Sequence, residues 1–385
     1  MTPFVGEFSL SRLERVISGP GTVNRLADEL DRRGCAAALV VTGRTLSRSP
    51  RLTRVIDGLG SRSAGVFPHT EQHVPASTVD ALVTMIRDTR ADCLISIGGG
   101  SPIDAAKAAV HVLLGGSDGP GAAYRSGTAA LPHIAVPTTL SAGEFTAIAG
   151  ITDDRSRIKR AVADARLAPC VVITDPELTA DTPDWLWTSS GIRALDHAIE
   201  SIYSIRHHPL SDALASKAIT ALDAHVPGSV RCDDPARLAH RGHCQVAAWL
   251  SVFGIANSGF GLSHAFGHQI GPRWNVPHGY TSCVMLPHAM RFMASVAPER
   301  FGPIAEGLAV PFDASAPQAA AFACADRVAG VISGLGLPTR LRDVGVPAED
   351  VAQIAGVVHE AMERAQVVGR PLQRTEIAAL LGAAH

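Results

Sequence analysis

The first half of the chain alternates short apolar runs with segments of helical periodicity. The residues between Ser77 and Thr89, for example, place Val79, Leu82, Val83 and Ile86 on one helical face. A second helix is predicted near residues 49–59. The short apolar runs are predicted strands, at Ala37–Thr42, Ala64–Phe67, Cys93–Ile97, His133–Val136 and Cys170–Thr174. Strands that alternate with helices predict an α/β domain with a mostly parallel sheet.

Strand patterns fade after Asp175-Pro176, and alanine-rich helical segments follow. These predicted helices lie at Gly191–Ser204, Ser211–Ala224, Arg237–Gly254, Gln318–Leu335 and Val351–Ala365. We therefore expect an α/β domain over residues 1–180 and an all-helical domain over residues 181–385. The glycine-rich stretch Gly115–Gly121 is predicted to be a flexible surface connection.

Composition excludes several classes of function. The 34 basic and 36 acidic residues give a net charge of −2, which provides no basic surface for nucleic acid. Seven cysteines without a CxxC pair favour reduced thiols. No apolar run approaches the ~20 residues of a membrane helix, and the first residues do not resemble a signal peptide. We expect a cytoplasmic protein that acts on a small molecule, with no nucleic-acid or membrane partner.

Three glycines, Gly98, Gly99 and Gly100, lie between a predicted strand and a predicted helix. Ser101 is expected to be the N-cap, with Pro102 at the first helical position and Asp104 completing a capping box. A helix N-terminus with exposed amides can bind a pyrophosphate. The alternative interpretation is a plain strand-to-helix turn, because the loop is not GxGxxG.

Hydroxyl side chains follow the predicted strand His133–Val136. Thr138, Thr139 and Ser141 come directly after it, and ligands of parallel sheets bind beyond the carboxyl ends of strands. These hydroxyls are therefore candidates for contact with a phosphate or ribose. The alternative is a serine- and threonine-rich turn without a ligand.

Histidines are concentrated in the second half. His264 and His268 are four residues apart and share a helix face, and His278 follows through a loop. Arg193 and His197 have the same spacing on another helix. Converging imidazoles can hold a transition metal, bind substrate or move protons. Structural histidines with hydrogen-bonded rings are the alternative.

Taken together, these segments resemble the iron-containing alcohol dehydrogenases and the related maleylacetate reductases, from about Gly19 to about His288. The motifs that carry the likeness are GGGSPIDAAKA, VPTT, ITDPEL, GIRALDHAIE, GLSHAFGH and PHG. The resemblance implies a dinucleotide-binding α/β domain beside an all-helical domain, as in the dehydroquinate synthase-like fold. It also implies NADPH or NADH as cofactor and a homodimer. No family motif is found past Val310.

Two details are similar to the maleylacetate reductase branch: the compact TTLSAGEFT loop, and Gln72-His73-Val74-Pro75 in place of an Asn-Pro pair. By contrast, the sequence of the phosphate loop, GGGSPIDAAK, is similar to that of the alcohol dehydrogenases. In the metal-dependent members one helix reads G-x-D-A-L-x-H, with the aspartate and the histidine as ligands. This chain has Arg193 at the aspartate position.

The resemblance implies that His197, His264 and His278 match the three histidine ligands of the metal-dependent members. They could hold Fe²⁺ or Zn²⁺, but a guanidinium cannot donate a lone pair to a metal. Our hypothesis is that Arg193 replaces the metal as the fixed positive charge. His268 matches the family's non-ligand active-site histidine and is expected to donate a proton or orient substrate.

The expected reaction is NAD(P)H-dependent reduction of a carbonyl or conjugated C=C in a small carboxylate-bearing substrate. Gly43 and Arg44 stand where NADH-specific relatives often carry an aspartate, so NADPH is permitted and NADH stays usable. Lys159 matches a family lysine near the cofactor; the alternative is a surface residue. Two other functions remain open, a metal-dependent alcohol dehydrogenase and a non-redox NAD-using lyase or inactive nucleotide-binding homologue.

Overall fold

A computed structural model of the chain describes residues 7–115, 130–156, 159–231 and 233–385. The predicted surface connection 115–121 lies, beyond Gly115, outside these residues. The chain divides into two compact units. One unit, here the α/β unit, is Ser11–Pro183. The other, the helical unit, is Asp184–His385 together with the described residues up to Leu10.

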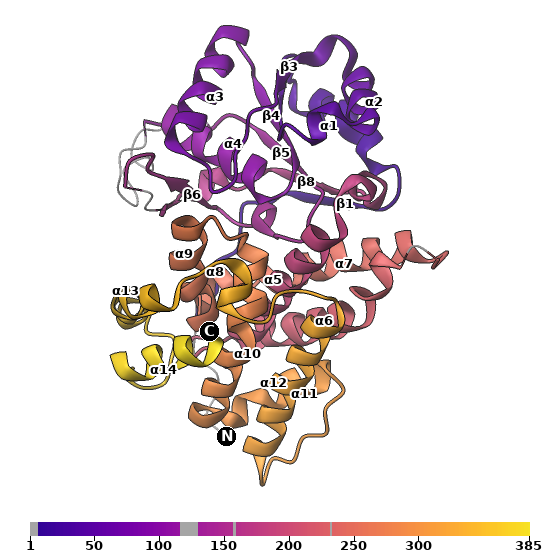
Figure 1. Cartoon of the computed structure of the whole chain (residues 1–385). Coiled ribbons are helices and arrows are strands. Elements are labelled where there is room, and N and C mark those ends of the chain that lie inside the picture. Colours follow the sequence, from indigo (N-terminus) through magenta and orange to yellow (C-terminus); the bar gives the residue numbers. More distant parts are fainter. Residues whose placement is uncertain (1–6, 116–129, 157–158, 232) are drawn as a thin grey trace. The chain divides into compact units, whose positions relative to one another are not determined.

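The described residues of the α/β unit form a six-stranded parallel sheet in the order β1-β8-β5-β4-β2-β3 (Figure 1). The predicted strands are all present. The bounds are β1 Arg15–Ser18, β2 Ala38–Val41, β3 Ser63–Phe67, β4 Cys93–Gly98, β5 His133–Pro137 and β8 Val171–Thr174. Sequence patterns did not predict β1, nor the antiparallel hairpin of β6 (Ile148–Thr152) and β7 (Lys159–Ala163). The prediction of a parallel sheet is confirmed.

Helices cover both faces of this sheet. They are α1 Leu26–Arg33, α2 Pro50–Leu59, α3 Ala76–Thr89 and α4 Gly100–Leu113. Successive residues of a strand point to opposite faces. Leu39 and Val41 of β2 accordingly pack in the core with α3 and α4. Ala38 and Val40 pack in the core with α1 and α2. A strand buried on both faces explains why these runs are uniformly apolar.

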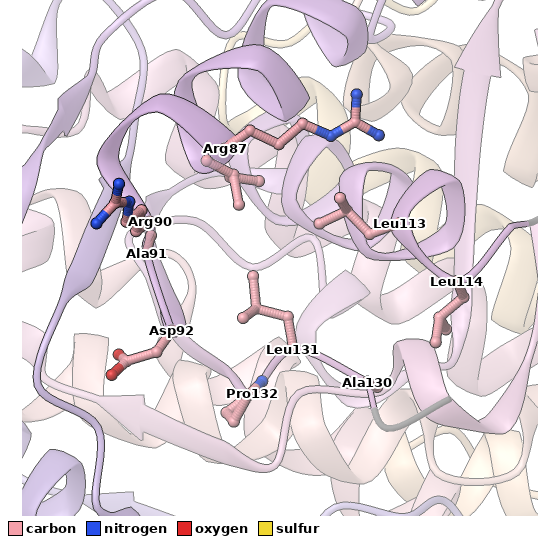
Figure 2. Close-up of a pocket in the computed structure, with 10 residues that line it drawn as sticks. Arg87, Arg90, Ala91, Asp92, Leu113, Leu114, Ala130, Leu131 and Pro132 are labelled. Carbon is pink, nitrogen blue, oxygen red and sulfur yellow. The ribbon is translucent and has the colours of Figure 1, made fainter. Parts of the chain in front are cut away.

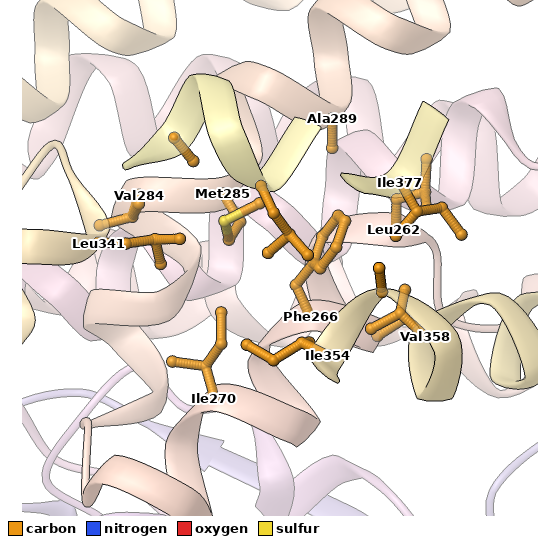
Figure 3. Packing of buried hydrophobic residues seen from close by; sticks show 14 of the residues in the cluster. Leu262, Phe266, Ile270, Val284, Met285, Ala289, Leu341, Ile354, Val358 and Ile377 are labelled. Atoms are coloured by element: carbon orange, nitrogen blue, oxygen red, sulfur yellow. The ribbon is translucent and has the colours of Figure 1, made fainter. Parts of the chain in front are cut away.

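The helices of the helical unit are α5 Asp184–Tyr203, α6 Pro209–His225, α7 Arg237–Val252, α8 Ile255–Ser258, α9 Leu262–Trp274, α10 His278–Val296, α11 Gly302–Gly307, α12 Pro317–Gly334, α13 Val351–Ala365 and α14 Arg374–Ala384. They include all five predicted helices, of which α5 and α6 are longer than expected and α7 is slightly shorter. One core joins α9 and α10 to the last two helices. Phe266 and Met285 pack there with Ile354, Val358 and Ile377 (Figure 3). The C-terminal helices therefore support α9 and α10.

Among the described residues, no single helix is long and apolar enough to cross a membrane. One bent pair, residues 237–258 with 262–274, passes that test by length and composition alone. The six cysteines in the described part of the chain form no disulfide.

Candidate active site

The glycine loop at the carboxyl end of β4 brings the chain directly into α4. Gly98 has φ 146°, and a Cβ there would lie 2.9 Å from Cγ of Pro102. The N-cap is Gly99, which has an extended backbone, and α4 begins at Gly100. The prediction that Ser101 is the N-cap is therefore wrong, because the flexible glycines let the helix start earlier. The first-turn amides of α4 carry no side-chain cap.

Asp104 does not close a capping box either. Its Oδ2 accepts a hydrogen bond from the amide of Gly150 in β6, at 3.3 Å. The aspartate thus ties α4 to the β6–β7 hairpin. The side chain of Lys159, in β7, packs against the same Gly150. The β6–β7 hairpin therefore places Lys159 near Asp104 of α4.

The hydroxyl-bearing loop after β5 (His133–Pro137) packs against the glycines. The amide of Thr138 donates to the Gly98 carbonyl at 2.8 Å. A Cβ at Gly99 would lie 3.3 Å from Oγ1 of Thr139, and one at Gly100 would lie 3.4 Å from Oγ of Ser141. Both hydroxyls are buried and have no hydrogen-bond partner among the described residues. A buried hydroxyl without a partner is costly, so this pair fits a ligand that supplies one. The phosphates of a dinucleotide meet that need.

The buried ammonium of Lys107, which contacts the segment after this loop, was not anticipated from the sequence. Lys107 of α4 is fully buried, and its ammonium donates to the carbonyls of Gly143 and Ile148 and to the Thr146 hydroxyl. Burial lowers the pKa of Lys107 to about 8 and raises the pKa of the nearby Glu144 to about 7. Lys107 fastens the loop that carries Ser141 to α4. Its place in GGGSPIDAAK, one turn beyond Asp104, is the signal that could have indicated it.

Gly43 and Arg44 follow β2, the neighbour of β4 in the sheet. A Cβ at Gly43 would lie 3.6 Å from Oγ1 of Thr70, a buried hydroxyl without a partner in the described part of the chain. Arg44 is exposed, with one guanidinium nitrogen 3.9 Å from a carboxylate oxygen of Glu71. The predicted cofactor residues of β2, β4 and β5 thus share the carboxyl edge of the sheet.

In the helical unit, four predicted histidines form a row contributed by α5, α9 and α10. Ring centroids are 4.9 Å apart for His197 and His264, 6.4 Å for His264 and His268, and 6.2 Å for His268 and His278. His197 and His264 are buried, whereas His268 is exposed. The Nδ1 atom of His197 and the Nε2 atom of His264 have no hydrogen-bond partner among the described residues.

Arg193 lies beside this row, buried in α5. Its Nη1 donates to the Ser282 hydroxyl at 3.1 Å and lies 3.7 Å from Oδ2 of Asp196. Within the described part of the chain this is its one hydrogen bond, so most of its five N–H donors are unused. Burial lowers the pKa of Arg193, and Asp196 and Glu200 partly offset this effect. Arg193 is paired with Asp196 inside the unit and does not lie on a solvated helix face, because α5 is buried from Trp187 to Tyr203.

Two carboxylates of α5 fix His264. Glu200 accepts from Nδ1 of His264 at 2.6 Å and from the amides of Gly261 and Ser263 at 2.7 Å each. Glu200 therefore caps the N-terminus of α9. It binds Nδ1 of His264, so Nε2 of that ring points away from Glu200. Asp196 accepts from the hydroxyls of Ser263 and Ser282 at 2.7 Å each. The sequence offered Asp196 and Glu200 as ion-pair partners of Arg193, and Asp196 also as a substitute metal ligand, but not as the groups that orient His264. Their spacing of four on the helix face shared with His197 was the available signal.

The charges of this network act on the histidines in opposite directions. Burial and Arg193 lower the pKa of His264, but Asp196 and Glu200 outweigh them and raise it. Burial, His264 and Arg193 hold the pKa of His197 well below its ordinary range. The two neighbouring buried imidazoles therefore have pKa values shifted in opposite directions.

We tested whether these residues fit a divalent metal. Among the described residues, the one group whose ligand atoms all lie within 4.8 Å of one another is Asp196, Glu200 and His264. Its carboxylate oxygens already accept hydrogen bonds from amides, hydroxyls and the imidazole, apart from Oδ1 of Asp196. The row of histidines contains no carboxylate, and Arg193 places a positive charge beside it. The carboxylates of Asp196 and Glu200 are thus already engaged by hydrogen-bond donors, and a metal ion there would have to displace them beside the charge of Arg193.

A cavity of about 460 Å³ lies elsewhere in the α/β unit (Figure 2). Its lining includes Asp92 and Pro132, which precede β4 and β5, and Arg87 and Arg90 at the end of α3. It is thus at the amino edge of the sheet, opposite the glycine loop, and holds none of the predicted site residues.

Comparison with known proteins identifies the chain as an NAD(P)-dependent oxidoreductase. Residues 14–176 match the model of iron-containing alcohol dehydrogenase, and residues 187–385 match the C-terminal model of the same family. The chain belongs to the iron-containing alcohol dehydrogenase family and is maleylacetate reductase-like. Because the second match reaches residue 385, the family likeness extends well past Val310, where sequence motifs had ended.

Individual relatives agree with this assignment. The chain is 34% identical to the maleylacetate reductase of Burkholderia cepacia, covering 97% of this chain and 96% of that protein. It is 30% identical to the lactaldehyde reductase of Escherichia coli K12, covering 93% and 94%. The crystal structure of maleylacetate reductase from Rhizobium sp. strain MTP-10005 has a TM-score of 0.81 and 27% identity, covering 100% of this chain and 98% of that one. These similarities confirm the predicted fold class.

Proposed function

We propose that the protein is an NAD(P)H-dependent reductase of a small, carboxylate-bearing carbonyl compound, with Arg193 in place of a catalytic metal. The reducible bond is a C=O, or a C=C conjugated to it. The observation that carries the proposal is the buried guanidinium of Arg193, which uses one of its five N–H donors on Ser282. A buried, planar guanidinium with unused N–H donors is well suited to bind a carboxylate or an enolate oxygen that gains negative charge.

The α/β unit supplies the cofactor site in this proposal. The unpartnered hydroxyls of Thr139 and Ser141, beside the start of α4, would hold the pyrophosphate of NADPH or NADH. The loop after β2 contains no carboxylate that would repel a 2′-phosphate, and Arg44 supplies a positive charge there. The carboxylate of Glu71 lies 3.9 Å from a guanidinium nitrogen of Arg44. The reduced nicotinamide, when bound, supplies a hydride.

The helical unit supplies the groups that act on the acceptor. Arg193 would bind the carboxylate or the oxygen that gains charge as hydride adds to carbon. Asp196 holds Arg193 in place, with the hydroxyl of Ser282 bridging the two. The proton that completes the reduction would come from His268, the exposed member of the row, or from Nε2 of His264. Hydride and proton together account for the two electrons and two hydrogens added.

A competing function is metal-dependent alcohol oxidation with His197, His264 and His278 as ligands. The two unpartnered imidazole nitrogens would suit it, but the missing carboxylate and the Arg193 charge oppose it. A non-redox lyase of the same fold would leave NADPH unconsumed. A chelator therefore distinguishes the metal-dependent enzyme from the proposed reductase, and NADPH consumption distinguishes the lyase from it.

The test is a screen of NADPH and NADH oxidation with chelator present, over aldehydes, ketones and unsaturated keto acids. A keto acid should then be compared with its methyl ester, using wild type, Arg193→Met and the control Arg206→Met, which alters an exposed arginine of the same unit. One charge-assisted hydrogen bond is worth about 1.5–3 kcal/mol, so Arg193→Met should lower kcat/KM for the acid about 10- to 150-fold. The ester should lose much less. Equal losses for acid and ester would refute the role of Arg193 in carboxylate binding.

A further inference from the structure

Three imidazoles gather where α6 ends and α7 begins, in residues that the proposed reaction does not use. His225 is the last residue of α6, and His240 and His243 lie on the first two turns of α7. The ring of His225 lies 5.1 Å from that of His240 and 4.4 Å from that of His243, with the latter pair stacked 15° from parallel. We propose that this α6–α7 histidine cluster binds a first-row transition-metal ion such as Zn²⁺.

The hydrogen bonds of the cluster aim two ring nitrogens at one point. Nδ1 of His225 and Nδ1 of His240 are 2.8 Å apart, so one must donate a proton and the other accept it. Oδ2 of Asp234 lies 3.4 Å from Nε2 of His240 and favours the proton on that nitrogen. Nδ1 of His240 is then the acceptor and Nδ1 of His225 the donor. A carboxylate on the far nitrogen is also what metal-bound histidines commonly have.

A metal ion can take the place of the shared proton. Two nitrogens bound tetrahedrally at the usual zinc distance lie about 3.3 Å apart, so the pair must open by roughly half an ångström. The ring of His240 is held against Gly228, where a Cβ would lie 2.8 Å from its Nε2. His225, at the helix end, is therefore the partner that shifts. On binding, the proton of His225 moves from Nδ1 to Nε2 of the same ring by exchange with solvent, so His225 coordinates as a neutral imidazole and no oxidation state changes.

The third ligand is His243, which shares a face of α7 with His240 because the two are three residues apart. His243 is exposed. To become the third ligand, its ring must rotate about the Cα–Cβ bond from the stacked position toward the other two rings. Water completes a tetrahedral site. The side chains of His240 and Asp234 keep 23% and 24% of their exposure, so an ion reaches the cluster from solvent. The bound ion would join the end of α6 to the start of α7.

The probe is Zn²⁺ alone, added by equilibrium dialysis to the full-length protein after chelator treatment. Wild type should bind one equivalent more than the double variant His225→Gln/His240→Gln. His243→Gln should weaken that equivalent at least tenfold, and the control His69→Gln, which alters an exposed histidine of the α/β unit, should keep it. His264→Gln should also keep it, which separates this site from the histidine row.

Co²⁺ gives a second readout, since a tetrahedral nitrogen site produces intense visible absorption that the double variant should lack. Zn²⁺ should also raise the melting temperature of wild type and not that of the double variant. Equal Zn²⁺ stoichiometry in wild type and the double variant would overturn the proposal. So would a loss in His69→Gln as large as that in His243→Gln. Matching circular dichroism of the metal-free proteins establishes that each variant is folded.

Discussion

The unpartnered hydroxyls of Thr139 and Ser141 lead to a prediction in which stability and affinity change in opposite directions. Thr139→Val keeps the shape of the side chain and removes its buried hydroxyl. A buried polar group without a partner costs about 1–3 kcal/mol. The cofactor-free variant should therefore be more stable than wild type by about 1 kcal/mol, or roughly 2–4 °C in melting temperature.

The same hydroxyl should matter once NADPH is bound. A hydrogen bond to a charged phosphate is worth about 1.5–3 kcal/mol, so Kd for NADPH should rise about 10- to 150-fold in Thr139→Val. Ser141→Ala should behave in the same way. The matched control is Thr146→Val in the same loop, whose hydroxyl is already bonded to Lys107 and the Gly143 carbonyl. It should lower stability and leave Kd nearly unchanged.

Chemical unfolding without cofactor and a fluorescence titration with NADPH measure both quantities. A less stable Thr139→Val protein with wild-type affinity for NADPH would refute the reasoning. That result would mean that the hydroxyl has a partner within the protein and makes no contact with cofactor.

Three further predictions concern single side chains. The pKa of Glu144 is raised from 4.5 to about 7, so the folded protein keeps a proton there that the unfolded chain releases between these values. Stability should therefore fall as pH rises from 4.5 to 7, by about 3 kcal/mol at most, and urea unfolding of Glu144→Gln should lack this slope. Gly98→Ala should cost about 1–3 kcal/mol in unfolding free energy, because φ is 146° and a Cβ would lie 2.9 Å from Pro102. Glu200→Gln should lower kcat more than tenfold while KM for NADPH stays constant, because His264 loses its orienting carboxylate and the cofactor site is in the other unit; an equal change in both constants in steady-state kinetics would contradict this.

The sequence predicted the parallel sheet well because its strands are buried on both faces, as Leu39 and Val40 illustrate, and therefore read as continuous apolar runs. It missed β1 (Arg15–Ser18), a short edge strand whose pairing with β8 depends on a partner some 150 residues away in the chain. The N-cap at Ser101 was wrong for a local reason: the φ of 146° at Gly98 allows α4 to begin at Gly100, and side-chain capping rules do not take such a backbone turn into account.

For the candidate site, motif spacing placed His264 and His268 on one helix face, and the structure adds His197 and His278 to the same row. Spacing could not show which nitrogens are satisfied, since this depends on helices far apart in the chain. The role of Glu200 in capping α9 is an example, because the cap joins residues 61 and 63 positions apart. Burial of Lys107 and Glu144 was equally hidden, since charged residues are ordinarily exposed.

The central claim is that Arg193 supplies the positive charge for which other family members use a metal. The most direct measurement is NADPH-dependent turnover of a keto acid by wild type and Arg193→Asp, each stripped with chelator and then titrated with Fe²⁺ or Zn²⁺. Wild-type kcat should be the same before and after metal addition, and Arg193→Asp should be inactive in the chelator-stripped state. Loss of wild-type turnover on chelation, with recovery on adding Fe²⁺ or Zn²⁺, would contradict the claim.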